Sequence, residues 1–329
     1  MMSSLKASCI AYSNIALIKY WGNRDDERRL PMTASISFAL DKAFTTTTVE
    51  IDAAFGTDRI ELDGTPATGP SATRISRHLD LLRAEAGTHL PARVVSRNNF
   101  PMGAGIASSA SGFAALTCAA AWALGLELSE RELSRLARRG SGSAARSIPG
   151  GFVEWHAGDD AHSFAETLAP AEHWPLHDLV AIVARGAKTV GSTEGHHLAH
   201  TSPLYRARVT QVEHDLPVMR RAILTRDFAT LGQLAEADAL SMHAVMMTSR
   251  PSLLYWSPGT IAIMQSVREW RRAGLACYFT IDAGPNVHVL CAPEDSAKTA
   301  VRLRALPEVA SLIECAVGPG ARCIEDHLF

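Results

Sequence analysis

The sequence predicts a protein of the mixed α/β class that is divided into two domains. A chain of 329 residues exceeds the size at which a single hydrophobic core usually stops growing, so two cores are expected. Segments typical of strands alternate with segments of helical spacing along the whole chain. We place the domain boundary shortly after an irregular polar stretch at 159–174, which gives domains of residues 1–177 and 178–329.

Strands are expected where β-branched and apolar residues run between turn residues. In chain order these runs are 5–12, 33–40, 44–51, 58–62, 94–99, 152–156, 179–184, 276–281, 287–291 and 310–317.

Helices are expected where apolar residues recur at helical spacing. These segments are 71–85, 107–124, 129–137, 204–222, 227–247, 258–273 and 294–304. Two of them carry clear start signals: Ser129 is followed by Glu132, as in a capping box, and Ser257 precedes Pro258.

Composition excludes several classes of function. The formal net charge is −2 and no run of lysine or arginine indicates a nucleic-acid partner. The longest apolar stretch, near 114–128, is rich in alanine and too short to span a bilayer. The first residues lack a secretory hydrophobic region, so we expect a soluble, cytoplasmic protein without membrane contacts.

The six cysteines are scattered and form no C-x-x-C pair. Most lie in apolar runs, where a free thiol behaves as a small hydrophobic side chain. We therefore expect reduced core thiols rather than a disulfide or zinc framework. The cysteines are Cys9, Cys118, Cys277, Cys291, Cys315 and Cys323.

A stretch of small residues at 99–112 runs directly into the helix expected at 107–124. A glycine-rich turn that opens a helix directs free N–H groups and the positive end of the helix dipole at one point, which suits a phosphate. The stretch matches neither the Walker pattern nor the dinucleotide fingerprint. A helix of small residues packed closely against a neighbour remains the alternative.

Three charged residues lie in unusual surroundings. Lys19 stands among apolar neighbours, Arg146 follows a loop of small residues, and Asp282 ends a strand before Ala-Gly-Pro. Each has a structural alternative: a lysine stem that reaches water, a surface arginine, and an aspartate in a turn. Residues 24–29, by contrast, are interpreted as a charged surface turn.

Three histidines cluster at the start of the second half of the chain. His196 and His200 have i, i+4 spacing, but Glu194 precedes the first of them, whereas the H-E-x-x-H motif needs a glutamate directly after it. No complete ligand set is visible, so metal binding is not expected. The sequence gives no role to His196, His197 or His200.

Five motifs occur in a fixed order from near the first residue to near the last. They are NIALIKYWG (14–22), PMGAGIASSAS (101–111), RGSGSAARS (139–147), GGFVEW (150–155) and DAGPN (282–286). Together they resemble the mevalonate diphosphate decarboxylases of the GHMP kinase superfamily. The resemblance implies an N-terminal domain like domain 2 of ribosomal protein S5, a ferredoxin-like C-terminal domain, an active site between them, and a homodimer.

The resemblance also implies an ATP-dependent decarboxylation in isoprenoid biosynthesis. The 3-hydroxyl of a 5-phosphorylated mevalonate is phosphorylated, and phosphate and CO₂ then leave. By resemblance, Asp282 handles the hydroxyl proton, Lys19 keeps that aspartate ionised, and Arg146 holds the substrate carboxylate with Ser141 and Ser143.

The remaining site residues are expected at the two phosphorylated ends. By resemblance, ATP and Mg²⁺ are the cofactors, and Ser108 is the candidate Mg²⁺ ligand. The nucleotide is expected to lie against Ser96, Asn98, Gly103, Gly105, Ser108 and Ser109. The 5-phosphate end of the small-molecule substrate is expected to lie against Tyr20, Asn23, Ser192 and Thr193.

Two departures from the family pattern bear on the substrate. Asn23 stands where the family usually has a lysine that reaches the diphosphate, and His196 stands where a methionine is usual. Losing a cation weakens the case for a diphosphate, so we expect (R)-5-phosphomevalonate, converted to isopentenyl phosphate. The alternative is (R)-5-diphosphomevalonate, converted to isopentenyl diphosphate. A kinase that stops after phosphorylation and a silent binding protein remain open, and a Rossmann oxidoreductase is disfavoured.

Overall fold

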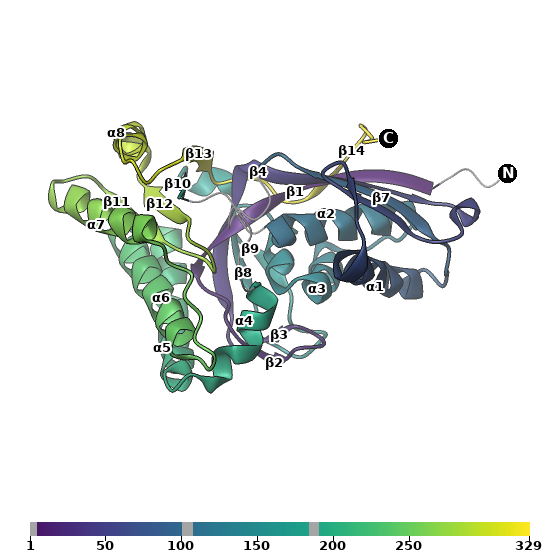
Figure 1. The fold of residues 1–329 in the computed structure, drawn as a ribbon, viewed down its shortest axis with the longest axis horizontal. Helices are drawn as coiled ribbons and strands as arrows, with labels where there is room; N and C mark the ends of the chain where they lie inside the picture. The colour runs from purple at the N-terminus through teal and green to yellow at the C-terminus, as the bar shows by residue number, and fades with distance from the viewer. Residues whose placement is uncertain (1–4, 101–107, 184–190) are drawn as a thin grey trace.

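Two long antiparallel strands, β1 (Leu5–Ile18) and β4 (Ser35–Ile51), run through the middle of the molecule and organise the rest of the chain (Figure 1). The structure is a computed structural model that describes residues 5–100, 108–183 and 191–329. The short sheet of β2 (Asn23–Asp25) and β3 (Leu30–Pro31) lies between the two long strands in sequence. Lys19 directly follows the last residue of β1, and this end of the strand is buried.

The first sheet has the strand order β14-β1-β4-β7-β5-β6, with β8 paired to β4 and β9 paired to β8. Its other strands are β5 (Arg59–Leu62), β6 (Thr65–Pro66), β7 (Ala92–Asn98), β8 (Phe152–Trp155), β9 (Ala165–Ala169) and β14 (Arg322–Ile324). Three helices gather beside it (Figure 1): α1 (Gly69–Glu85), α2 (Ser108–Ala123) and α3 (Glu130–Gly140). Short 3₁₀ segments follow at Ala53–Phe55, Gly142–Ser147, Ala171–His173 and Ala199–Thr201.

The second sheet has the strand order β11-β12-β10-β13 and is antiparallel throughout. Its strands are β10 (His177–Ile182), β11 (Cys277–Thr280), β12 (Val287–Cys291) and β13 (Ser311–Ala316). The helices of this half are α4 (Ser192–Leu198), α5 (Tyr205–Thr225), α6 (Phe228–Thr248), α7 (Pro258–Arg272) and α8 (Pro293–Arg304).

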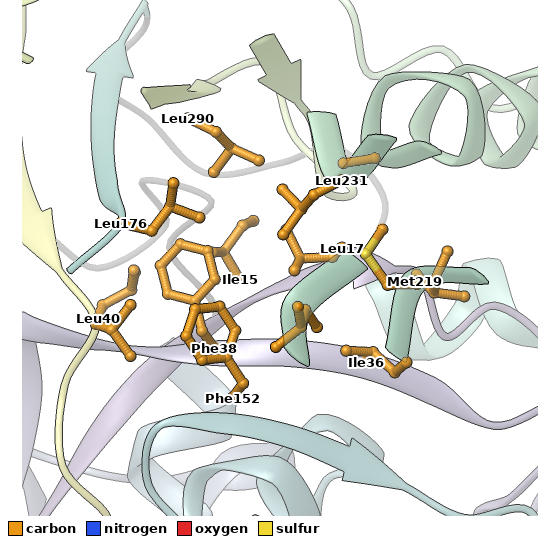
Figure 2. Packing of buried hydrophobic residues seen from close by; sticks show 14 of the residues in the cluster. Ile15, Leu17, Ile36, Phe38, Leu40, Phe152, Leu176, Met219, Leu231 and Leu290 are labelled. Carbon is orange, nitrogen blue, oxygen red and sulfur yellow. The ribbon is translucent and has the colours of Figure 1, made fainter. Parts of the chain in front are cut away.

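One hydrophobic cluster joins the two halves of the chain (Figure 2). Ile15 of β1 and Phe38 of β4 are fully buried in it together with Met219 of α5, Leu231 of α6 and Leu290 of β12. Burying one such side chain contributes about 1.5–3 kcal/mol. The shared core therefore holds α5 and α6 against the end of β1, where Lys19 emerges.

The structure confirms the mixed α/β class and most of the expected elements. Both predicted helix starts are confirmed: the side chain of Ser129 accepts from the backbone N–H of Glu132, as expected for a capping box, and the side chain of the expected N-cap Ser257 accepts from the N–H of Thr260. The boundary expected between residues 177 and 178 falls at the start of β10 and stays a prediction.

Several element assignments were wrong. The two strands expected at 33–40 and 44–51 form the single strand β4, because β8 pairs with its first part and β7 with its second. The stretch at 159–174, expected to be irregular, contains β9. Helix α4 was expected to be a loop, and β14 was not predicted.

The expectation of six free thiols was also wrong. Strand β14 pairs antiparallel with β1, so Cys9 lies directly opposite Cys323, and the two form a disulfide. This pairing joins residues 314 positions apart, and no spacing rule could indicate it. The other four cysteines are free and buried, as expected. Within residues 5–100, 108–183 and 191–329, no helix has the length and apolar character needed to span a bilayer.

Candidate active site

The ammonium of Lys19 and the carboxylate of Asp282 form an ion pair at 2.6 Å. Lys19 follows β1 and is 1% exposed, whereas Asp282 follows β11 on the other sheet. Burial alone raises the pKa of Asp282, but the charges of Lys19, His288 and Arg146 outweigh it and hold the pKa below its usual value. Asp282 is thus a carboxylate that stays ionised in a half-buried position.

Arg146 is a buried guanidinium without a carboxylate partner within 4 Å in the part of the chain that the structure describes. Its Nε donates to Asn14 Oδ1 at 3.2 Å, and its Nη1 donates to Ser35 Oγ at 2.7 Å. Burial lowers the pKa of Arg146 to about 10, against the opposing charge of Asp282. Since buried charges need counter-ions, the group is ready to bind an anionic ligand.

These three charged residues line one cavity, here called the substrate cavity. Six further residues expected from the sequence also line it: Tyr20, Ser109, Ser141, Ser143, Ser192 and Thr193. A carboxylate, an ammonium and a guanidinium that converge in one cavity can bind an acid and move a proton at a neighbouring hydroxyl.

A second cavity, here called the nucleotide cavity, meets the first at Ser109. Ser96, Asn98 and Ser108 line it with other polar residues, Arg74 among them, and its apolar wall consists of Leu62, Ile75, Val94, Phe113 and Leu116. Apolar walls with a few polar groups suit a flat heterocyclic base. The expected nucleotide residues Gly103 and Gly105 lie outside the described residues.

The residues present fit a magnesium ion that arrives with a nucleotide rather than one held by a protein cage. Within the described ranges, no group of three or more His, Cys, Asp or Glu side chains could hold a metal ion. Mg²⁺ usually keeps several waters and is bound through substrate phosphates with few protein ligands. The hydroxyl of Ser108, at the start of α2, is compatible with such a role.

The rings of Tyr20, Trp21 and His196 line one part of the substrate cavity, here called the ring-closed end. The ring of His196 stacks on Tyr20 with a centroid distance of 4.1 Å and lies 4.5 Å from that of Trp21. The backbone N–H of Gly22 donates to His196 Nδ1 at 2.9 Å, so the proton of the neutral ring resides on Nε2. Burial, with a contribution from Arg29, lowers the pKa of His196 to about 3, so the ring is neutral at pH 7.

Asn23 does not line the cavity. Its Oδ1 accepts from the hydroxyl of Tyr20, and its Nδ2 donates to Asp26 Oδ1 at 2.8 Å. Both ends of its amide are therefore engaged by neighbours. Asp26 also contacts His197 Nδ1 at 2.7 Å, so this histidine serves as a partner of an exposed carboxylate.

Sequence reasoning gave no site role to several residues that the structure brings to the site, among them Asn14, Arg29, Asp238 and Arg208. Asn14 holds Arg146, and Arg29 lines the substrate cavity although residues 24–29 were interpreted as a surface turn. Asp238 and Arg208 bind the backbone of Lys19 from α6 and α5. Asn14 could have been noticed as a polar residue within a buried strand, but nothing near the other three indicated their positions.

Two family models match the chain. One is described as the diphosphomevalonate decarboxylase-like N-terminal domain and matches residues 11–165. The other is described as the mevalonate 5-diphosphate decarboxylase C-terminal domain and matches residues 178–319. Together they cover most of the chain.

Individual relatives agree with these models. The chain is 38% identical over 324 residues to diphosphomevalonate decarboxylase mvd1 of Aspergillus fumigatus, covering 92% of this chain and 80% of that relative. It is 36% identical over 288 residues to phosphomevalonate decarboxylase of Haloferax volcanii, covering 87% and 88%. A solved structure of MDDEF in complex with MVAPP, AMPPCP and magnesium superimposes with a TM-score of 0.91 at 42% identity, covering 98% of this chain and 100% of that one.

Proposed function

Because this chain belongs to the diphosphomevalonate decarboxylase family and is an ATP-dependent decarboxylase of the mevalonate pathway, we propose that its preferred substrate is (R)-5-phosphomevalonate and its product isopentenyl phosphate. Family membership and the GHMP kinase fold inferred from the five motifs are both confirmed. The observation that carries the decarboxylation is the convergence of Lys19, Arg146 and Asp282 in a cavity that meets the nucleotide cavity at Ser109.

Asp282 is proposed to accept the proton of the substrate's tertiary 3-hydroxyl. The ion pair with Lys19 at 2.6 Å keeps the carboxylate ionised and fixes its orientation. Once the 3-oxygen has left, the same negative charge stabilises the positive charge that develops at C3. One residue can thus assist both halves of the reaction.

Arg146 is proposed to bind the substrate carboxylate. Its Nε and Nη1 are already held by Asn14 and Ser35, so the guanidinium plane is fixed before any ligand arrives. The hydroxyls of Ser141 and Ser143 lie 3.4 Å apart in the same wall and can donate to that carboxylate. A fixed carboxylate keeps the breaking C–C bond aligned with the leaving 3-oxygen.

ATP and Mg²⁺ are the proposed cofactors, and bound together they supply the phosphoryl group and compensate its charge. The structure of MDDEF holds AMPPCP and magnesium, which supports this assignment. In this chain the apolar wall around Phe113 would bind the base, and Ser108 and Ser109 would face the phosphates. Ser109 lies 3.2 Å from Ser141, so a chain of hydroxyls leads from one cavity to the other.

The choice of a monophosphate is based on the ring-closed end of the substrate cavity. Asn23 carries no charge and its amide is already engaged, while Asp26 beside it would repel a second phosphate. Most of the similar relatives are named diphosphomevalonate decarboxylase. These names favour (R)-5-diphosphomevalonate, which is the second candidate. The Haloferax volcanii relative, named phosphomevalonate decarboxylase, supports the first.

Steady-state kcat/KM with ATP and each phosphorylated mevalonate tests the proposal. We expect a preference for the monophosphate of at least tenfold, with one CO₂ released per ADP. Replacing Asn23 by lysine should raise kcat/KM for the diphosphate about tenfold or more, since one charge-assisted contact contributes about 1.5–3 kcal/mol. The neutral variant N23M separates this gain from the lost bond to Tyr20. A preference of the unmodified enzyme for the diphosphate would overturn the monophosphate assignment, and ADP without CO₂ would indicate a kinase.

A further inference from the structure

We propose that Arg29 provides the cation that binds the 5-phosphate of the substrate, replacing the lysine that is absent at position 23. The inference deepens the proposed function, since it assumes a 5-phosphorylated substrate. It assigns a binding role to a residue that the sequence places in an ordinary charged turn. Arg29 lies immediately before β3 and lines the substrate cavity together with Tyr20, His196 and Ser192.

The backbone at Arg29 adopts an unusual conformation. Its φ of 52° lies in the left-handed region, which non-glycine residues rarely adopt, and arginine gains nothing from it locally. Such conformations persist where the surrounding structure enforces them, and they cluster at ligand sites. The neighbouring Arg28, by contrast, is 54% exposed and pairs with Asp25 at 3.1 Å.

The side chain of Arg29 is anchored at one point. Its Nε donates to the carbonyl of Arg139 at 3.2 Å, near the C-terminal end of α3. Within the described residues, no carboxylate lies within 4 Å of this guanidinium and its two terminal nitrogens make no further hydrogen bond. An arginine fixed through Nε keeps the geometry with which two N–H groups bind a phosphate.

The electrostatic surroundings place this charge at the ring-closed end of the cavity. Burial dominates the raised pKa of Tyr20, and Arg29 is the strongest charge that opposes it. Burial also dominates the lowered pKa of His196, with Arg29 the strongest charge that adds to it. The guanidinium therefore acts on both rings, and its effect on each is opposite in sign to that of Asp26.

The nearby charged groups allow a single anion to bind at this end. Asp26 is engaged by Asn23 and His197, and Glu27 is exposed to solvent. Tyr20 and His196 are neutral, so they add no charge, and the hydroxyl proton of Tyr20 is already donated to Asn23. Arg146 also acts on both rings but is assigned to the substrate carboxylate, so Arg29 is the guanidinium that remains for one phosphate group.

The test replaces Arg29 by asparagine, which removes the charge and tolerates the left-handed backbone. We expect R29N to raise KM for 5-phosphomevalonate about 10- to 100-fold, with KM for ATP and the melting temperature almost unchanged. R28N on the same turn is the matched control and should behave like the unmodified enzyme. R29K keeps a charge without the planar fork and should give an intermediate KM, which also keeps the test decisive if R29N folds poorly.

The outcomes separate this inference from the proposed substrate. If the unmodified enzyme prefers the diphosphate but R29N raises KM for both phosphorylated substrates, the role of Arg29 stands and the monophosphate assignment fails. If R29N leaves KM unchanged for both, or raises KM for ATP alone, Arg29 does not bind the 5-phosphate. An effect of R28N as large as that of R29N would likewise overturn the proposal, because it would reflect the charge of the turn as a whole.

Discussion

The carboxylate of Asp238 on α6 accepts a hydrogen bond from the backbone N–H of Lys19 at 2.7 Å. Arg208 on α5 binds this carboxylate at 3.1 Å and also donates to the backbone carbonyl of Lys19 at 3.3 Å. Both helices belong to the C-terminal half of the chain, whereas Lys19 extends from β1. A buried ion pair of one half therefore fixes the residue that pairs with Asp282.

We predict that D238A lowers the free energy of unfolding by about 3–5 kcal/mol, because it leaves Arg208 buried without its counter-ion. The double variant D238L/R208M should recover most of that stability, since an apolar pair can replace a buried ion pair. It should not recover kcat, because Lys19 still lacks its backbone partners. Denaturant unfolding and steady-state kinetics measure the two effects.

The exposed Glu213 on α5 supplies the control for these variants. E213A should leave the free energy of unfolding almost unchanged and kcat within about twofold of the unmodified enzyme. Full recovery of kcat in D238L/R208M would contradict a positioning role for the ion pair and assign it to stability alone.

We next predict that K19M shifts the acid limb of kcat to higher pH. In the unmodified enzyme the pKa of Asp282 is held below its usual value, so the carboxylate keeps its charge until the pH falls through that low value. K19M removes the strongest charge that opposes burial, so the pKa of Asp282 rises. The residual kcat at saturating substrate, measured between pH 4.5 and 8, reports this group in the bound enzyme.

K42M is the matched control, because Lys42 is exposed on β4. It should keep the acid limb of the unmodified enzyme. Identical acid limbs in K19M and the unmodified enzyme would show that Lys19 does not set the ionisation of the reacting base.

A third prediction concerns Gly112 on α2, which lines the nucleotide cavity. A Cβ at this position would meet no heavy atom within 4 Å, so a larger side chain would occupy the open space of the cavity. G112L should raise KM for ATP at least tenfold without lowering the melting temperature, because leucine forms helices better than glycine by somewhat under 1 kcal/mol. G112A, which adds only a methyl group, should stabilise the protein and change KM for ATP little. An unaltered KM in G112L would place the nucleotide elsewhere.

Apart from α4, which was expected to be a loop, the helices were predictable because their signals are local. Ser129 with Glu132, and Ser257 with Pro258, mark helix starts within four residues of sequence, and the structure places caps at both. Strand β14 has only three residues, too few to show an alternating pattern, and it exists because β1 offers it an edge.

The site residues also differ in whether a local sequence signal marks them or a distant contact places them. Lys19, Arg146 and Asp282 lie in motifs that a reader can recognise, and the structure brings them into one cavity. Arg29 was missed because its position depends on a carbonyl 110 residues further along the chain. Asp238 lies in a helix whose sequence gives no sign that its carboxylate meets the end of β1.

The last prediction separates stability from function at Arg146. Burial lowers the pKa of this guanidinium from its ordinary value of 12.5 to about 10, so at pH 7 its charged form opposes folding by roughly 3 kcal/mol. R146M removes this unfavourable charge, but it also leaves Asn14 and Ser35 without their hydrogen-bond partner, which offsets part of the stability gained. We therefore expect R146M to be at least as stable as the unmodified protein.

The same variant should lose activity. Removing two charge-assisted hydrogen bonds to the substrate carboxylate should lower kcat/KM about 10²- to 10⁴-fold. R146K keeps the charge but not the planar fork, so its kcat/KM should lie between that of the unmodified enzyme and that of R146M. Denaturant unfolding at pH 7 checks the predicted stability, and turnover with ATP checks the predicted loss of activity. A large loss of stability in R146M would show that Arg146 holds the fold together, whereas a stable, inactive variant would show that its charge is retained for the substrate.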